Sequence, residues 1–458
     1  MQSQKVTLIL DSVRRLIRRG ATQRVMNVLH KGRPADVAQV LHGLNELDRH
    51  AVFAVLSQND KELAAASLSE FGVEEGIELL HTLSPEDIAQ VLQELPSDDA
   101  ALFLEKFSVE LRERLLDLMK IEASTDVQEL LSFAEYTAGR IMTPDVFALN
   151  EELSVGEAVS AIQKASSDIE LVFYLYTVDD RSHLVGVVSL RQLLLVPPTT
   201  PLRKIMHTDV ISVRTETDQE EVARIVARYN LLGVPVVDEE NKLVGVVTVD
   251  DVLDVIREEA TEDIYALAGV SSDDNVLSAP IRSVRLRLPW LLVNLATAIL
   301  ASTVVHFFEP TIAKVTVLAS LMPIVAGMGG NAATQTLAVI VRGLALGEVT
   351  WENSRRVIVK EAMVALANGL VTGVVAAFVV WLWYGATAKM ALIGGIIALA
   401  MINNMFIAGV AGTAVPLILK KLKADPALAS TVFVTTCTDV GGFMSFLGLA
   451  TLLIKYLV

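Results

Sequence analysis

The chain has 458 residues, long enough for about three domains, and 52% of them are hydrophobic. Residues 1–287 carry a formal charge of −20, whereas residues 288–458 carry +4. A front half this acidic repels nucleic acid and attracts cations, so a nucleic-acid partner is excluded, although the same charge also serves solubility.

Residues 1–135 are predicted to form helices joined by short turns, in a cytosolic N-terminal domain. The first apolar run, Val6–Leu10, is too short for a signal peptide and ends at Asp11, so we expect the N-terminus to stay in the cytosol. The segment Pro34–Leu41 is repeated as Pro85–Leu92. Repeated helical segments stack on one another, which predicts an all-α superhelical domain.

Residues 136–249 contain a second internal repeat. Ile141–Val146 is matched by Ile205–Val210, and Leu184–Leu190 is matched by Leu243–Val249. Each copy has the pattern of an extended segment, a helix, two strands and a final helix, with strands expected at 172–178, 185–189, 234–237 and 243–248. The repeat resembles a tandem pair of CBS domains. This resemblance implies an α+β module that often dimerises and often binds adenine nucleotides, so ATP is a candidate ligand.

Residues 250–275 begin with a predicted acidic helix that connects the repeat to the membrane half. Its acids lie close together in the sequence: Asp250, Asp251, Asp254, Glu258, Glu259, Glu262 and Asp263. Like charges three and four residues apart destabilise a helix in water, and a bound divalent cation removes this repulsion. A solvated acidic face is the alternative.

Residues 276–458 contain five apolar stretches, each long enough to span a bilayer core: 289–308, 315–341, 362–384, 389–419 and 427–454. Because they contain almost no charge, a buried soluble core is excluded. The loops on one side hold ten Lys and Arg residues, and those on the other side hold three. This bias predicts a multi-pass protein of the cell membrane, in contact with lipid, with a cytosolic N-terminus and an external C-terminus. Five spans do not form a symmetric pore alone, so we expect a homodimer with its pore near the two-fold axis.

Asp439 is the only acid well inside a predicted span. A carboxylate at that depth costs about 3 kcal/mol unless it faces water or a cation. It therefore indicates an ion site. The alternative is a hydrogen bond to a neighbouring helix, helped by Thr435 and Thr438.

The segment Pro323–Thr336 contains a proline and three close glycines within the second span. These residues are predicted to weaken the helix and to free carbonyl oxygens, which are tolerated at that depth where they line a water-filled path. Oxygen ligands without a His or Cys cluster suit a hard cation such as Mg²⁺ or Ca²⁺. Close helix packing through small residues explains the glycines equally well. Asn294, Asn403 and Asn404 are expected to make hydrogen bonds between helices rather than to bind ions.

The order of helical domain, CBS pair, acidic helix and five spans resembles the MgtE family of magnesium channels over nearly the whole chain. The resemblance implies a homodimer in which the second and fifth spans line the pore and the acidic helix is a plug near its cytosolic mouth. The pore-lining positions that it implies are Asp439 (the pore aspartate), Gly330, Asn331, Thr334 and Thr435. The regulatory Mg²⁺ ligands that it implies are Asp218, Glu220, Asp251, Asp254, Glu259, Glu262, Asp263 and Asp425. The chain departs from the family pattern at Gln90, Asn230, Thr334 and Thr431, which leaves Glu86 as the expected ligand in the N-terminal domain.

The predicted function is an Mg²⁺-selective channel that closes when cytosolic Mg²⁺ binds the acidic regions. A coupled divalent-cation carrier is an alternative, but it requires further intramembrane acids. A membrane-tethered cation or nucleotide sensor without transport is another, and it leaves the deep carboxylate unexplained. An enzyme is not expected, because the sequence shows neither a Gly-rich phosphate loop with a Lys nor a nucleophile–base pair.

Overall fold

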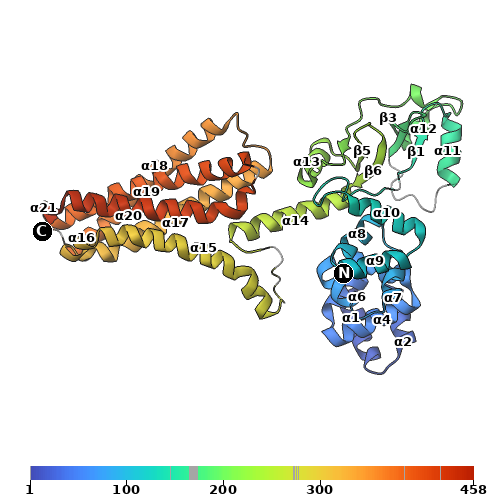
Figure 1. Cartoon of the computed structure of the whole chain (residues 1–458), viewed down its shortest axis with the longest axis horizontal. Coiled ribbons are helices and arrows are strands. Elements are labelled where there is room, and N and C mark those ends of the chain that lie inside the picture. Colours follow the sequence, from blue (N-terminus) through green and yellow to red (C-terminus); the bar gives the residue numbers. More distant parts are fainter. Residues whose placement is uncertain are drawn as a thin grey trace. The chain divides into compact units, whose positions relative to one another are not determined.

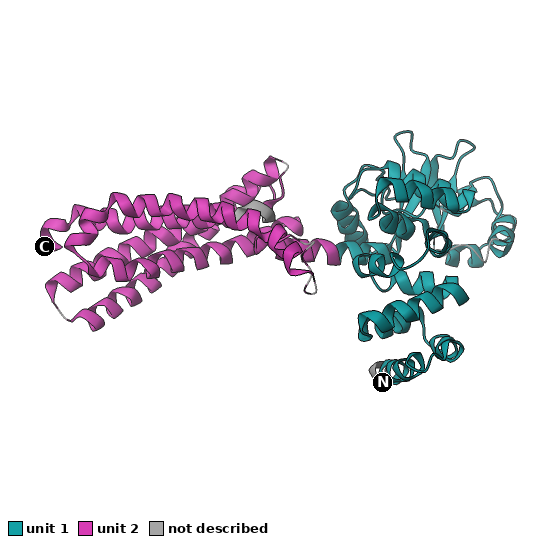
Figure 2. Cartoon of the chain, turned by 60° about the horizontal axis from the view of Figure 1, so that its bottom comes forward, with its two compact units in different colours: residues 1–256 teal, residues 257–458 magenta. Residues whose placement is uncertain are grey.

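The computed structural model describes residues 2–144, 146–164, 174–271, 274, 276, 278–385, 387–422 and 424–457. The chain divides into two compact units, residues 1–256 and residues 257–458, which Figure 2 shows in different colours. The first unit holds a helical part and two small β-sheets, and the second holds long apolar helices. The predicted multidomain fold class is confirmed: an all-α N-terminal part, an α+β repeat pair and a helical membrane part.

Ten short helices form the N-terminal part, in which the structure describes every residue from 2 to 132. They are α1 (Gln2–Ile17), α2 (Thr22–Leu29), α3 (Pro34–Gly43), α4 (Glu46–Asn59), α5 (Lys61–Ser69), α6 (Val73–Leu80), α7 (Pro85–Leu92), α8 (Ser97–Glu105), α9 (Val109–Leu118) and α10 (Ile121–Ser132). The two copies of the sequence repeat begin α3 and α7. Pro34 and Pro85 stand in the first turn of these helices, where a missing N–H costs no hydrogen bond.

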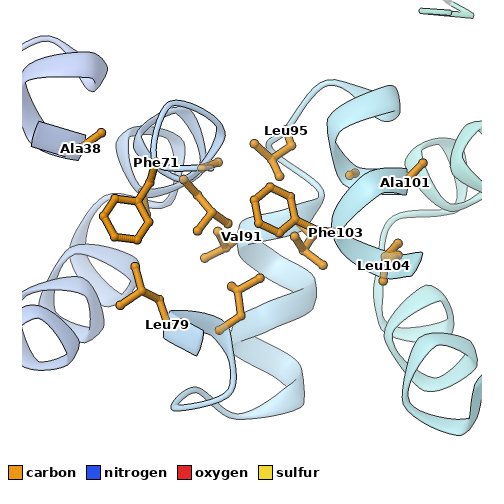
Figure 3. Packing of buried hydrophobic residues seen from close by; sticks show 14 of the residues in the cluster. Ala38, Phe71, Leu79, Val91, Leu95, Ala101, Phe103 and Leu104 are labelled. Carbon is orange, nitrogen blue, oxygen red and sulfur yellow. The ribbon is translucent and has the colours of Figure 1, made fainter. Parts of the chain in front are cut away.

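The N-terminal helices are held together by one apolar core. Phe71, Leu79, Val91 and Phe103 meet within it, as Figure 3 shows, and all four are buried. The same core continues into the second half of the repeat pair through residues such as Val247. Burial of such side chains contributes about 1.5–3 kcal/mol each, so the helical part and the second repeat are stabilised together.

Each copy of the second repeat forms a three-stranded sheet with the same topology. The strands are β1 (Ala148–Asn150), β2 (Tyr174–Val178), β3 (Leu184–Ser189), β4 (Val213–Arg214), β5 (Gly233–Val237) and β6 (Leu243–Thr248). In both sheets the first pair is parallel, the second pair is antiparallel, and the register shifts near the end of the middle strand. The helices of this region are α11 (Val155–Lys164), α12 (Leu190–Leu195), the 3₁₀ turn η1 (Leu202–Lys204), α13 (Gln219–Tyr229) and α14 (Val249–Leu267). The four predicted strands are confirmed, except that residues 172 and 173 lie outside the described residues.

The repeated Ile-Met and Leu-Val-Gly motifs pack against each other across the two copies. An added Cβ at Gly186 of the first copy would lie 2.6 Å from the sulfur of Met206 in the second copy. An added Cβ at Gly245 of the second copy would likewise overlap the side chain of Met142 of the first. The methionine of each copy therefore packs against the glycine of the other copy. This exchange explains why both motifs occur in both copies.

Among the described residues, five helices are long and apolar enough to cross a membrane. They are α15 (Pro280–Phe307), α17 (Val317–Ala345), α18 (Ser354–Tyr384), α19 (Ala388–Lys421) and α20 (Pro426–Leu452), with the short helices α16 (Glu309–Lys314) and α21 (Ile454–Leu457) beside them. α19 packs against α17, α18 and α20, and α15 packs mainly against α20 (Figure 1). α15 and α18 begin well before the predicted spans, because their polar first turns are helical as well.

The prediction that α17 is weakened at its proline and glycines is wrong. α17 runs as one helix from Val317 to Ala345, through Pro323 and all three glycines. Pro323 lies inside the helix, and none of these glycines adopts a positive φ. Pro323 has no N–H to donate to Ala319 O, but one missing bond does not free a run of carbonyl oxygens. Most ion contacts at this level therefore require side chains, water or carbonyls that accept a second bond.

Candidate functional site

Asp439 lies in the middle of α20, and its side chain is half-buried. Among the described residues, its carboxylate has no hydrogen-bond or ion-pair partner. The nearby threonines donate to carbonyl oxygens of their own helix: Thr435 Oγ1 to Thr431 O at 2.8 Å and Thr438 Oγ1 to Thr435 O at 2.9 Å. They therefore do not satisfy the carboxylate, which remains available for water or a cation.

The predicted pore residues of α17 lie on the face that the other helices of the chain leave open. Asn331 and Thr334 are exposed, and an added Cβ at Gly330 would meet nothing within 4 Å. Thr334 Oγ1 donates to Gly330 O at 3.0 Å, so this carbonyl accepts a bond from outside the helix ladder. Small-residue packing, the alternative explanation, holds for Gly329, which is buried against α19, but not for Gly330.

The three asparagines of the spans differ in their surroundings. Asn404 of α19 is buried, and its Nδ2 donates to Val325 O of α17 at 2.8 Å, so the predicted hydrogen bond between helices is confirmed for this residue. Asn294 and Asn403 are exposed on their helices. The two glycines that follow Asp439, Gly441 and Gly442, do not bring another backbone close. Gly441 and Gly442 instead face the side chains of Ile407 and Asn404.

The end of the acidic helix α14 is docked on two membrane helices. Ala266 and Leu267 pack with Leu337 and Val341 of α17, in a small apolar cluster. Thr431 Oγ1 of α20 donates to Leu267 O at 2.9 Å and so caps the last turn of α14. The carbonyls at a helix end lack partners within the helix, so this bond fixes the end of α14 against the helix that contains Asp439.

Three of the predicted regulatory ligands already have local roles. Asp218 caps α13 by accepting from Glu220 N at 2.9 Å, and the Glu220 carboxylate pairs with Arg224 at 2.9 Å. Glu86 pairs with Arg114 at 3.1 Å on the exposed surface. Exposed pairs of this kind contribute less than about 1 kcal/mol, so they would break readily in favour of a divalent cation.

A group of mutually repelling acids in the first unit includes two that the sequence patterns did not indicate. Asp98 and Asp99 open α8, and they repel Asp251 and its neighbours at the start of α14. Burial, followed by the charge of Asp251, raises the pKa of Asp98 well above its usual range, and its buried Oδ1 has no partner among the described residues. Burial is also the main cause that raises the pKa of Asp251 from 3.8 to about 7, against the lowering effect of its hydrogen bond from Thr248. Acids in a first helical turn are common because they favour the helix dipole, so their sequence pattern does not indicate this repulsion.

The remaining predicted ligands all take part in polar or electrostatic interactions: Asp254, Glu259, Glu262, Asp263 and Asp425. Within the described part of the chain, no group of three or more His, Cys, Asp or Glu side chains is placed to hold a metal ion. The structure therefore brings Asp98, Asp99 and Asp251 close enough to repel one another, but not into a complete coordination shell.

Four segments of the chain match family models. Residues 322–449 match the MgtE model, described as a divalent cation transporter, and residues 32–136 match the MgtE intracellular N domain. Residues 138–198 and 202–258 each match a CBS domain. The matches follow the order of the elements along the chain.

Two bacterial transporters are similar over most of the chain. The magnesium transporter MgtE of Thermus thermophilus is 38% identical over 345 residues, which cover 75% of this chain and 76% of the relative. That of Bacillus subtilis is 37% identical over 342 residues, which cover 75% of each.

Solved structures resemble the N-terminal half of the chain. One is the cytosolic domain of the Mg²⁺ channel MgtE in complex with ATP, with 39% identity, a TM-score of 0.51, and coverage of 54% of this chain and 99% of that one. Another is the soluble part of a magnesium transporter, with 29% identity, the same TM-score, and coverage of 57% and 100%.

Proposed function

Because this chain belongs to the MgtE family, we propose that it is a membrane-embedded Mg²⁺ channel whose cytosolic part binds the same ion and closes the pore. The observation that supports the proposal most is Asp439, a carboxylate inside a membrane helix with no partner among the described residues. Such a group costs about 3 kcal/mol at the bilayer centre. A cation with its water shell offsets that cost, whereas the neighbouring threonines do not.

The proposed ion path lies between α17 and α20 of two copies of the chain. Asn331 and Thr334 are polar and exposed at membrane depth, where lipid would leave them without hydrogen bonds. A second copy across a two-fold axis would cover this face and bring two Asp439 side chains to one path. Mg²⁺ keeps several waters of its shell, so Asn331, Thr334 and Gly330 O suit contacts with those waters. Thr435 is half-buried one turn before Asp439 and completes the proposed lining.

The proposed gate is the docked end of α14. Its contacts with Leu337, Val341 and Thr431 lie on the two helices that are proposed to line the path. The helix carries the proposed regulatory acids Asp251, Asp254, Glu259, Glu262 and Asp263, and Asp425 directly precedes α20. Cytosolic Mg²⁺ bound by these carboxylates would reduce their repulsion and favour the docked position. When Mg²⁺ is scarce, the repulsion would favour release.

The proposed sensor of the first unit includes Asp98 and Asp99 together with Asp251, while Asp218, Glu220 and Glu86 belong to the wider acidic surface. Buried carboxylates that repel each other fit a divalent cation, which supplies the missing positive charge. ATP is the proposed ligand of the CBS pair, since a similar cytosolic domain was solved with ATP. The proposed orientation, from the loop charges, places these sites in the cytosol.

The test is ion flux into proteoliposomes that contain the full-length protein, with Mg²⁺, Mn²⁺, Co²⁺ and Ca²⁺ in turn. The proposal expects Mg²⁺ uptake down its gradient, and a lower rate when millimolar Mg²⁺ faces the cytosolic side. Uptake that depends on a H⁺ or Na⁺ gradient would instead identify a coupled carrier. Absence of divalent flux from an intact dimer would leave only the role of a membrane-tethered sensor.

A further inference from the structure

Asn404 is a buried amide at the point where three membrane helices meet. It belongs to α19, it is 1% exposed, and its Nδ2 donates to Val325 O of α17. Its Oδ1 is buried and has no hydrogen-bond partner among the described residues. An amide that is only half satisfied in an apolar bundle is unfavourable compared with an aliphatic side chain. Its presence therefore indicates a role other than simple packing.

Two glycines from different helices form a socket around this amide. An added Cβ at Gly442 of α20 would lie 2.6 Å from Asn404 Nδ2 and 2.9 Å from its Cγ. An added Cβ at Gly329 of α17 would overlap Nδ2 and lie 2.8 Å from Cγ. Neither glycine has a positive φ, so the backbone conformation does not require glycine at these positions. What requires glycine is the space that the amide occupies.

The socket lies next to the residues of the proposed ion path. Gly329 directly precedes Gly330 in α17, and Gly442 lies one helical turn after Asp439 in α20. A helix is stiff over one turn. The separation of α17 and α20 at the socket therefore sets the separation of Gly330 and Asp439.

We propose that Asn404 is a positioning residue for ion passage: its amide, inserted between Gly329 and Gly442, fixes the spacing of the two helices that line the path. The inference rests on the proposed function and adds to it a determinant of selectivity in α19, a helix that contributes none of the proposed pore-lining residues. Removal of the amide leaves space into which α17 and α20 can shift. The path then loses the width that suits one hydrated ion over another.

The first test is a double-mutant cycle in the full-length protein, read as Mg²⁺ flux per folded dimer. Gly442→Ala is expected to lower the flux at least about fivefold, because its Cβ overpacks the socket. Asn404→Ala should restore the flux of Gly442→Ala to within about twofold of Asn404→Ala alone. Gly441→Ala is the matched control, since its Cβ would lie 2.5 Å from Ile407 Cδ1 rather than near Asn404. The flux that Gly441→Ala loses should not be restored by Asn404→Ala. If the effects of the two single substitutions on the flux simply multiply in both double variants, the proposed insertion of Asn404 between the glycines is refuted.

The second test measures selectivity, which a purely structural role would not change. Asn404→Ala should raise the ratio of Ca²⁺ flux to Mg²⁺ flux at least about threefold, whereas loss of folded protein lowers both fluxes in proportion. An unchanged ratio would overturn the positioning role. If the wild-type protein carries no divalent cation, the proposed function fails. The same cycle, read from thermal unfolding of the detergent-solubilised dimer, would still show whether the socket exists.

Discussion

Replacement of Asp251 by Asn should stabilise the first unit, residues 1–256, although it removes a charged helix cap. Burial raises the pKa of Asp251 from 3.8 to about 7, and the charges of Asp250 and Asp99 add to this effect. A carboxyl group whose pKa is higher in the folded state than in the unfolded state keeps a proton that the unfolded state has lost. Its contribution to stability is therefore lost as the pH rises from 3.8 to about 7, and it does not change further above that range.

The size of the effect follows from the two pKa values. At pH 8 the ionised Asp251 lowers the free energy of unfolding by about 4 kcal/mol compared with a neutral group. Asn keeps an acceptor for the main-chain N–H of Thr248 but loses the charge of that hydrogen bond, which costs about 1 kcal/mol. The expected net gain for Asp251→Asn is about 2–3 kcal/mol at pH 8. This net gain in the free energy of unfolding should fall by more than half at pH 5, because Asp251 of the folded wild-type protein keeps its proton at that pH.

The assay is urea unfolding of a cytosolic fragment, residues 1–271, in chelator at the two pH values. Asp87→Asn is the matched control, because Asp87 accepts from Ser84 at the start of α7 just as Asp251 accepts from Thr248 at the start of α14. This control should be neutral or slightly destabilising. Millimolar Mg²⁺ should stabilise the wild-type fragment more than Asp251→Asn. Equal effects of the two substitutions at pH 8 would refute the reasoning from burial and repulsion.

Three further predictions concern the gate and the bundle. Proteolysis of residues 250–280 should be slower in millimolar Mg²⁺ than in chelator, and neutral replacements of Asp251, Asp254, Glu259 and Asp263 should remove the difference; identical digestion with and without the ion would contradict the sensor. Thr431→Val removes the donor to Leu267 O, so Mg²⁺ flux measured with high cytosolic Mg²⁺ should rise about fivefold, as expected from the loss of about 1 kcal/mol; an unchanged flux would exclude this cap from the gate. Gly369→Val places a Cβ 2.8 Å from Ile402 Cα of α19, so size-exclusion chromatography should show little folded protein; a normal yield would refute the close packing of α18 on α19.

Sequence patterns predicted the elements well, because each element has a local signal. Repeated motifs indicated two of the three strands in each sheet, and apolar length indicated the membrane helices. The repeats did not show that Met142 and Met206 pack against the other copy, since that exchange depends on tertiary structure. Pro323 was misjudged because a proline inside a helix removes one backbone hydrogen bond, and the remaining bonds keep α17 continuous.

The candidate site was predictable only in part. Asp439 was recognisable because an acid in an apolar stretch is unusual in itself. Asp98 and Asp99 have the ordinary composition of a helix start, and their importance lies in repulsion by acids at the start of α14, which is distant in the sequence. The Asn404 socket was hidden for the same reason: its amide was identified as a contact between helices, but its glycine partners lie on two other helices.

The central claim, that Asp439 attracts the permeating ion, is tested most directly by the flux of Asp439→Asn. The substitution keeps the shape of the side chain and removes its charge from a low-dielectric path, where attraction for a cation is far stronger than in water. Glu309→Gln at the exposed start of α16 is the control. The account predicts that Asp439→Asn reduces Mg²⁺ flux into proteoliposomes at least about a hundredfold, the loss of about 3 kcal/mol, in a folded dimer, while Glu309→Gln transports normally. Near wild-type flux from Asp439→Asn would contradict it.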